Sequence, residues 1–189
     1  MRASYHGDMP DITDESVFHK LLHAQIGNEF AASQQYIAVA IYYDSLDMPQ
    51  MAGHFYRQAV EERNHAMMIV QYFLDRDIAV EIPGVGGPRN DFADHQAPIE
   101  LALAQEKAVT EQVVELARSA RDCGDYLGEQ FMQWFLKEQV EEVATMTTLK
   151  TITERARGNL FDVENFVERE LGGAEAGDST APPAAGGNL

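Results

Sequence analysis

The stretch of sequence that decides the fold is Ala59-Val-Glu-Glu-Arg-Asn-His65-Ala-Met-Met68, which lies inside a long amphipathic segment. Residues three apart share one face of a helix, so the side chains of Glu62 and His65 point the same way. Both fall on the apolar stripe of this segment, whose other members are Met51, Phe55, Ala59, Ile69 and Phe73. A carboxylate and an imidazole buried side by side are costly unless something compensates them, and a metal ion is the simplest compensation.

The same helical spacing of apolar residues recurs along most of the chain and predicts an all-α fold. We expect four long helices over residues 14–43, 49–75, 97–121 and 126–157, and a short fifth helix over 160–171. Asp47 is a candidate cap for the second helix, with Pro49 near its first position. Gly158 and Asn159 are expected to end the fourth helix.

The connections between these helices indicate how they pack. A short turn joins the first two helices, which makes them antiparallel neighbours. Residues 77–96 separate the second helix from the third and contain Ile82-Pro-Gly-Val-Gly-Gly-Pro88, which cannot be helical throughout. At roughly 3.3 Å per extended residue this segment can travel the whole bundle, so the third helix is expected to run parallel to the second. We predict a four-helix bundle with one long crossover in a single domain of residues 14–171.

The ends and the composition of the chain limit its function. Residues 1–13 are expected to be loose, and the Gly-, Ala- and Pro-rich residues 172–189 are expected to form a flexible tail. With 31 acidic residues against 14 Lys and Arg, the net charge of −17 disfavours binding to nucleic acid or membrane; it either attracts cations or confers solubility. The single cysteine, Cys123, excludes an internal disulfide. No secretory signal or membrane-spanning apolar run is visible, so we expect a cytoplasmic protein.

Each long helix places a metal-capable position near the middle of its apolar stripe. These positions are Glu29 in the first helix, Glu62 and His65 in the second, Glu106 in the third, and Gln139 and Glu142 in the fourth. One such residue alone could be an interface residue. Metal-capable residues at the same depth in all four long helices do not readily arise by chance. Oxygen ligands with one imidazole suit iron or manganese. Two metals would share Glu62, and Fe(II) held in this way would pass electrons to dioxygen.

Two further groups adjoin this set. Tyr36 lies two turns after Glu29 on the same face, and it is either a core tyrosine or a redox or hydrogen-bonding neighbour of the metals. Glu61, Glu138 and Glu141 form a second acidic group, because adjacent helical residues point about 100° apart. This group is either a solvated surface or a third cation site that supplies ions to the two-metal centre or receives ions from it.

These motifs resemble those of the non-haem bacterial ferritins over about residues 15–171. The segments that carry the likeness are Asn28-Glu29 with Tyr36, Glu61-Glu62-Arg-Asn-His65, Gln105-Glu106, and residues 133–142. The chain is particularly similar to the actinobacterial, mycobacterial-type storage ferritins, including their Glu-rich sites and Gly/Ala-rich tail.

The resemblance implies a ferroxidase that stores iron. The implied ferroxidase centre is Glu29, Glu62, His65, Glu106 and Gln139, with Tyr36 nearby, and the implied third iron site is Glu61, Glu138, Glu141 and Glu142. The implied assembly is a hollow octahedral shell of 24 subunits that holds hydrated ferric oxide, with the fifth helix lining the four-fold channels. Glu129 is a candidate for the three-fold pores, with Asp122 and Asp125 as further candidates. The tail either lies on this shell or is disordered.

Two departures from the bacterioferritins matter. Those proteins carry a haem-ligating methionine directly after the bridging glutamate, whereas this chain has Arg63, so we predict no haem. They also carry a second Glu-x-x-His motif, whose place is taken here by Gln139-Val-Glu-Glu142. The second metal should therefore be held more weakly, as suits iron that passes through rather than stays.

Three rival functions are less consistent with the sequence. A di-iron oxidoreductase acting on an organic substrate or peroxide needs an electron-delivery module, a tight symmetric site or a substrate cavity, and one cysteine with one Glu-x-x-His argues against the first two. A DNA-protecting mini-ferritin would lack the fifth helix and would place ligands across a subunit interface. A bundle that only binds partners would leave its buried carboxylates uncompensated. We therefore predict a ferroxidase that uses Fe(II) and dioxygen.

Overall fold

The computed structural model describes residues 16–172 and 178–189, which form five helices and no strand. α1 spans Val17–Asp44, α2 Pro49–Asp75, α3 Ala97–Asp122, α4 Tyr126–Ala156 and α5 Leu160–Leu171. The all-α prediction is confirmed. The expected loose segment 1–13 lies outside the described residues. Among the helices that are described, none combines the length and the apolar character needed to cross a membrane.

α1 and α4 are slightly shorter than predicted, for local reasons. α1 begins at Val17 rather than at residue 14, because Ser16 is its cap: Ser16 Oγ accepts a hydrogen bond from His19 N at 3.2 Å. At the end of α4, Arg157 adopts a left-handed φ of 50° and Gly158 a φ of 87°. The chain therefore leaves the helix after residue 156, one position before the predicted end.

The start of α2 is capped by a distant helix rather than by its own turn. The prediction that Asp47 caps α2 is wrong, because Asp47 adopts a left-handed φ of 56° and Met48 occupies the N-cap position. The Glu164 carboxylate of α5 instead accepts hydrogen bonds from Gln50 N at 2.8 Å and Met51 N at 2.9 Å. A carboxylate at this end also interacts favourably with the helix dipole. These hydrogen bonds tie α5 to the end of the bundle where α2 begins.

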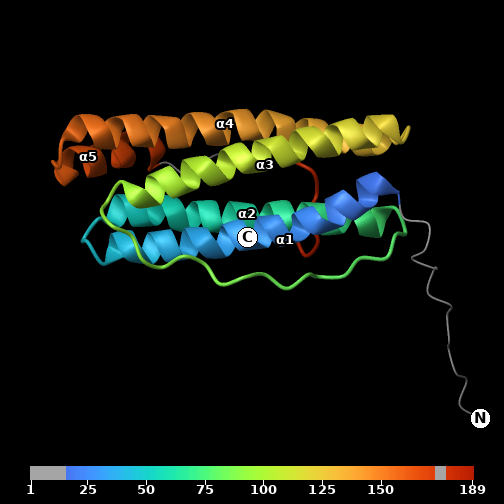
Figure 1. Ribbon diagram of the computed structural model, residues 1–189, viewed down its shortest axis with the longest axis horizontal. Coiled ribbons are helices and arrows are strands. Elements are labelled where there is room, and N and C mark those ends of the chain that lie inside the picture. The colour runs from blue at the N-terminus through green and yellow to red at the C-terminus, as the bar shows by residue number, and fades with distance from the viewer. Residues whose placement is uncertain (1–15, 173–177) are drawn as a thin grey trace, which may run out of the picture.

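A long crossover, residues 76–96, runs along the bundle and sets its topology (Figure 1). It returns the chain to the end where α2 began, so α3 runs parallel to α2 and the predicted bundle with one crossover is confirmed. Gln35 of α1 holds the crossover in place: its Nε2 donates to Arg89 O and its Oε1 accepts from Arg89 N, each at 2.8 Å. Tyr43 Oη donates a further hydrogen bond to His95 O at 2.7 Å.

A polar layer crosses the middle of the bundle and separates two apolar clusters. One cluster includes Phe18, Ile69 and Phe135, and the other includes Tyr43, Phe55 and Leu149. Every long helix contributes at least one buried polar residue to the layer between the two clusters: Glu29, Glu62, His65, Glu106, Gln139 and Glu142. Burial of the apolar clusters supplies the stability that offsets the cost of burying these acids.

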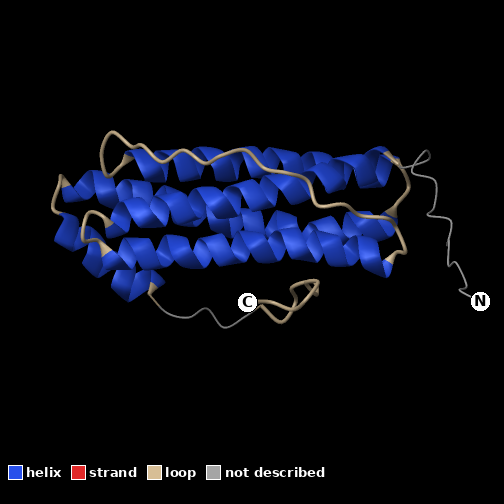
Figure 2. Cartoon of the chain, turned by 90° about the horizontal axis from the view of Figure 1, so that it is seen from below, coloured by secondary structure: helices blue, strands red, loops and turns tan. Residues whose placement is uncertain are grey.

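Residues 178–189 pack against the bundle on the side opposite the crossover (Figure 2). Trp134 Nε1 donates to Asp178 Oδ2 at 3.0 Å, and Lys137 Nζ lies 3.2 Å from the same oxygen. Ala185 is buried in the first apolar cluster, and its amide donates to Met67 O at 3.0 Å. These contacts are with α2 and α4, far away in the sequence, and the flexibility expected for residues 172–189 stays a prediction. Residues 173–177 lie outside the described part.

Candidate metal centre

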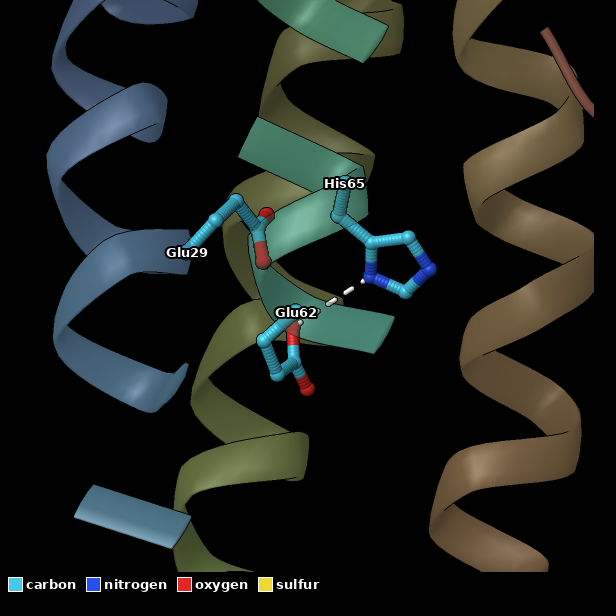
Figure 3. A group of neighbouring side chains, drawn as sticks. All are labelled: Glu29, Glu62 and His65. Carbon is cyan, nitrogen blue, oxygen red and sulfur yellow. Dashed lines mark hydrogen bonds and ion pairs between the residues drawn. The ribbon is translucent and has the colours of Figure 1, made fainter. Parts of the chain in front are cut away.

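Glu29, Glu62 and His65 form a compact group whose side chains converge from α1 and α2 (Figure 3). One ligand atom of each lies within 4.8 Å of the others, and all three residues are buried. His65 Nδ1 lies 3.3 Å from Glu62 Oε2, as their spacing on one helix face allows. Two carboxylates and an imidazole at this separation can bind one transition-metal ion.

Two buried ligand atoms of this group have no hydrogen-bond partner among the residues that the structure describes. Glu29 Oε1 accepts a hydrogen bond from Gln25 Nε2 at 2.8 Å, whereas Glu29 Oε2 and His65 Nε2 have no partner. A buried polar atom left unsatisfied costs about 1–3 kcal/mol. A cation at Glu29 Oε2 would supply the missing interaction, so the residues present fit a metal. Gln25 was not among the predicted site residues, and its only signal in the sequence is its position one turn before Glu29.

Glu106 and Tyr36 form another part of the polar layer. Tyr36 Oη donates a hydrogen bond to Glu106 Oε1. Gln139 Nε2 lies 3.5 Å from Glu106 Oε2, and Gln139 Oε1 accepts a hydrogen bond from Thr110 Oγ1 at 2.9 Å. Thr110, which was not among the predicted site residues, thus contacts Gln139, and its hydroxyl also lies 2.8 Å from Glu106 O. Glu106 does not belong to the compact group of three, so a cation bound to it would occupy a second position.

Burial makes these carboxyl groups difficult to ionise. Desolvation raises the pKa of Glu62 well above its ordinary value, and the charges of Glu106 and Glu29 raise it further. Desolvation also raises the pKa of Glu106, while the hydrogen bond from Tyr36 opposes that rise. The pKa of Tyr36 is raised by burial and then by the charge of Glu106. Acids crowded together in this way are stabilised when a proton or a cation binds between them.

A second acidic group lies beside the first, where α2 faces α4. Glu61, Glu138 and Glu142 offer ligand atoms within 4.8 Å of one another. Burial raises the pKa of Glu142 well above its ordinary value, and the charges of Glu61 and Glu62 add to this. Glu61 and Glu138 are only partly buried and border a cavity of about 150 Å³. Glu141, which was predicted as a fourth member, lines the same cavity but is exposed and lies outside the group.

Two of the three predicted pore residues, Glu129 and Asp125, form contacts within the chain. Glu129 accepts a hydrogen bond from Arg121 Nε at 2.9 Å. Asp125 caps the first turn of α4 and forms an ion pair with Arg76 at 2.9 Å. Asp122 is the exposed last residue of α3. The assignment of these residues to pores stays a prediction, and Asp125 already has a capping role in the single chain.

Comparisons with known proteins place the chain in a family. The model of the ferritin-like domain matches residues 19–156. The chain is 61% identical to ferritin BfrB of Mycolicibacterium smegmatis over 175 residues, which cover 93% of this chain and 96% of that protein. It is 35% identical to a bacterial non-heme ferritin of Staphylococcus aureus over 151 residues, which cover 80% and 90% of the two chains.

A solved structure shows the same fold at lower identity. The open pore ferritin of the hyperthermophilic archaeon Archaeoglobus fulgidus superimposes with a TM-score of 0.79 at 24% identity, covering 82% of this chain and 96% of that one. The matched family model and the relatives cover most of the helical bundle and include both acidic groups. The chain therefore belongs to the ferritin family, as an iron-storage protein with ferroxidase activity.

Proposed function

We propose that dioxygen oxidises Fe(II) at a dinuclear centre inside each subunit, formed by Glu29, Glu62, His65, Glu106 and Gln139. In this proposal Glu62 bridges the two ions, Glu29 and His65 hold the first, and Glu106 holds the second with Gln139 beside it. The observation that carries the proposal is the convergence of Glu29, Glu62 and His65, together with the unpartnered oxygen of Glu29. The contact between Glu106 and Gln139, and the effect of Glu106 on the pKa of Glu62, support a second position nearby.

The ligand set favours oxidation of the bound substrate. Anionic oxygen ligands stabilise Fe(III) more than Fe(II), so a bound Fe(II) ion gives up an electron readily. Two Fe(II) ions reduce one dioxygen molecule to the level of peroxide, and four reduce it to water; the ligand set is compatible with either product. Because burial raises the pKa values of Glu62 and Glu106, cation binding competes with protonation of these two carboxyl groups. Tyr36 holds the Glu106 carboxylate in one orientation through its hydrogen bond.

We further propose that Glu61, Glu138, Glu141 and Glu142 form a third iron site beside the dinuclear centre. The partial exposure of Glu61 and Glu138 and the adjoining cavity support exchange of iron with the surroundings. Gln139-Val-Glu-Glu142 stands where a second Glu-x-x-His motif would make the centre symmetric, which supports weak retention of the second ion. Iron would therefore pass from the centre into storage rather than remain as a permanent cofactor.

The storage compartment is proposed to be an octahedral shell of 24 chains that holds ferric oxyhydroxide in the cytoplasm. Exposed apolar side chains at Tyr126, Leu127 and Phe161 support burial against other subunits. The net charge of −17 supports attraction of Fe(II) rather than of nucleic acid or membrane. No haem is proposed, because Arg63 follows Glu62 where the bacterioferritins carry methionine.

Aerobic addition of Fe(II) to the metal-free protein, followed by size-exclusion chromatography and iron analysis, tests the proposal. We expect a particle of about 500 kDa, which 24 chains of 21.1 kDa give, and we expect this particle to oxidise and accumulate iron. A monomer that binds Fe(II) without oxidising it would contradict the proposal.

A further inference from the structure

The cavity between α2 and α4 extends from the second acidic group toward the end of α5. Its lining includes His54, Arg57 and Gln58 of α2, and Leu171 at the end of α5. Arg57 Nη2 donates to Leu171 O at 2.7 Å, so the guanidinium is tied to the end of α5. A volume of about 150 Å³ is enough for several water molecules, so the cavity can hold a cation with part of its water shell.

His54 and Gln58 line this cavity, and each has a buried polar atom that no described protein group satisfies. The two residues are 6% and 8% exposed, and neither His54 Nε2 nor Gln58 Oε1 has a hydrogen-bond partner. The amide nitrogen of Gln58 is already engaged, because it donates to Glu61 Oε2 at 2.7 Å. Residues 54, 58 and 61 share one face of α2, so the imidazole and the amide oxygen continue a line of ligands that begins at Glu61.

The imidazole of His54 is in the protonation state that a metal requires. Burial lowers the pKa of His54 to about 4, and the charge of Arg57 acts in the same direction. His54 is therefore neutral at pH 7, and neutral imidazole is the form that coordinates metal ions. The acidic residues Glu61, Glu138, Glu141 and Glu142 line the same cavity and outnumber the single cation, Arg57.

We propose that His54 Nε2 and Gln58 Oε1 bind a hydrated divalent first-row cation at a position separate from both acidic groups. His54 belongs to neither compact group, so the protein supplies two ligands and water supplies the others. A site with so few protein ligands binds weakly and exchanges quickly, as a transfer position must. Its role, which rests on the proposed function, is to pass Fe(II) between the α5 end of the cavity and Glu61.

Crystals of the full-length assembled protein soaked with Co²⁺ test the position directly. We expect an anomalous difference peak about 2.1 Å from His54 Nε2 in the parent protein. The His54→Leu variant should lose this peak alone, and the Thr145→Val variant, which alters the same cavity without removing a proposed ligand, should retain it. The proposal is overturned if the parent shows no peak beside Nε2, or if the peak persists in His54→Leu.

Binding and oxidation assays separate this proposal from the proposed function. Anaerobic calorimetric titration with Co²⁺ should show one weak class of sites lost, or weakened about tenfold, in His54→Leu but not in Thr145→Val. In aerobic stopped-flow assays with excess Fe(II), His54→Leu should turn over more slowly than Thr145→Val. Equal turnover by the two variants would overturn the transfer role. A parent that oxidises no Fe(II) would instead contradict the proposed function, while the Co²⁺ peak still decides the cation position.

Discussion

Glu61 and Glu62 are neighbours in the sequence, yet they belong to two acidic groups with different surroundings. Glu62 joins Glu29 and His65 in the polar layer between two apolar clusters, and it is only 3% exposed. Glu61 turns about 100° away and joins a group that borders a solvent-accessible cavity. The inner group therefore depends on a bound proton or cation to offset its burial, whereas the outer group keeps contact with water and can exchange its occupant.

Removing ligands from the inner group is expected to have the largest effect. The double variant Glu62→Ala, His65→Ala removes the proposed bridging carboxylate and the only imidazole of the centre. We expect the initial rate of Fe(II) oxidation, measured by stopped-flow absorbance, to fall about a hundredfold or more, because the protein no longer holds the two iron ions in position. Glu61→Gln is the matched control, since it changes the adjacent residue in the outer group. A double variant as fast as the parent would refute the assignment of the inner group.

The stability of the metal-free protein is expected to fall as the pH rises. Burial raises the pKa values of Glu62, Glu106 and Glu142 in the folded chain above the ordinary value of 4.5. Between that value and the raised folded-state values, the folded chain binds more protons than the unfolded chain, so the free energy of unfolding decreases with pH. Thermal unfolding of the metal-free protein should give a higher Tm at pH 5 than at pH 8.

Glu62→Gln tests the cost of burying the inner group, because it removes the buried charge and keeps the size of the side chain. We expect it to raise the free energy of unfolding of the metal-free protein at pH 8 by about 1–3 kcal/mol. In the presence of Co²⁺ the parent should have the higher free energy of unfolding, since it binds the cation more tightly than the variant does. Glu115→Gln on the exposed face of α3 is the control and should change neither measurement appreciably. An unchanged Tm for Glu62→Gln in both conditions would argue against a buried charge at this position.

Changes in the outer group should have a smaller effect, confined to later turnovers. In the double variant Glu61→Gln, Glu138→Gln the ligands of the inner group are intact, so the first oxidation should stay close to that of the parent. Continued turnover with excess Fe(II) should slow by up to about tenfold, because two charges that attract and pass on cations are gone. Comparing the first and later phases in one stopped-flow experiment measures this. A loss of the first phase would mean that the two groups act as one site.

Tyr36→Phe is expected to have the smallest effect. The variant removes the hydrogen bond that lowers the pKa of Glu106, so a larger fraction of Glu106 is protonated at a given pH. The oxidation rate should fall about two- to threefold at pH 6 and less at pH 8, as expected from the loss of roughly 0.5 kcal/mol or a little more from one hydrogen bond. Rates measured at the two pH values test this. A much larger, pH-independent loss would indicate that Tyr36 itself takes part in electron transfer.

The helices, the crossover and the inward direction of Glu29, Glu62 and His65 follow from the sequence alone. Which face of a helix a residue occupies depends on its spacing from neighbours within a few turns, and this is a local property. Loop lengths then limit how consecutive helices can be arranged. The catalytic roles of these three residues stay predictions, because spacing says which way a side chain points but not what it binds.

Contacts between distant segments were decided only by the tertiary structure. Glu164 of α5 caps α2 in place of Asp47, Thr110 contacts Gln139 from the neighbouring helix, and Asp178 bonds to Trp134 although its composition-biased segment predicts flexibility. Each contact needs two helices, or a helix and a tail, to match in rotation and axial position to within the length of a hydrogen bond. Periodicity does not set those quantities; packing of the whole chain does. It also decides that Glu61 borders a cavity with His54 while Glu62 lies in the core.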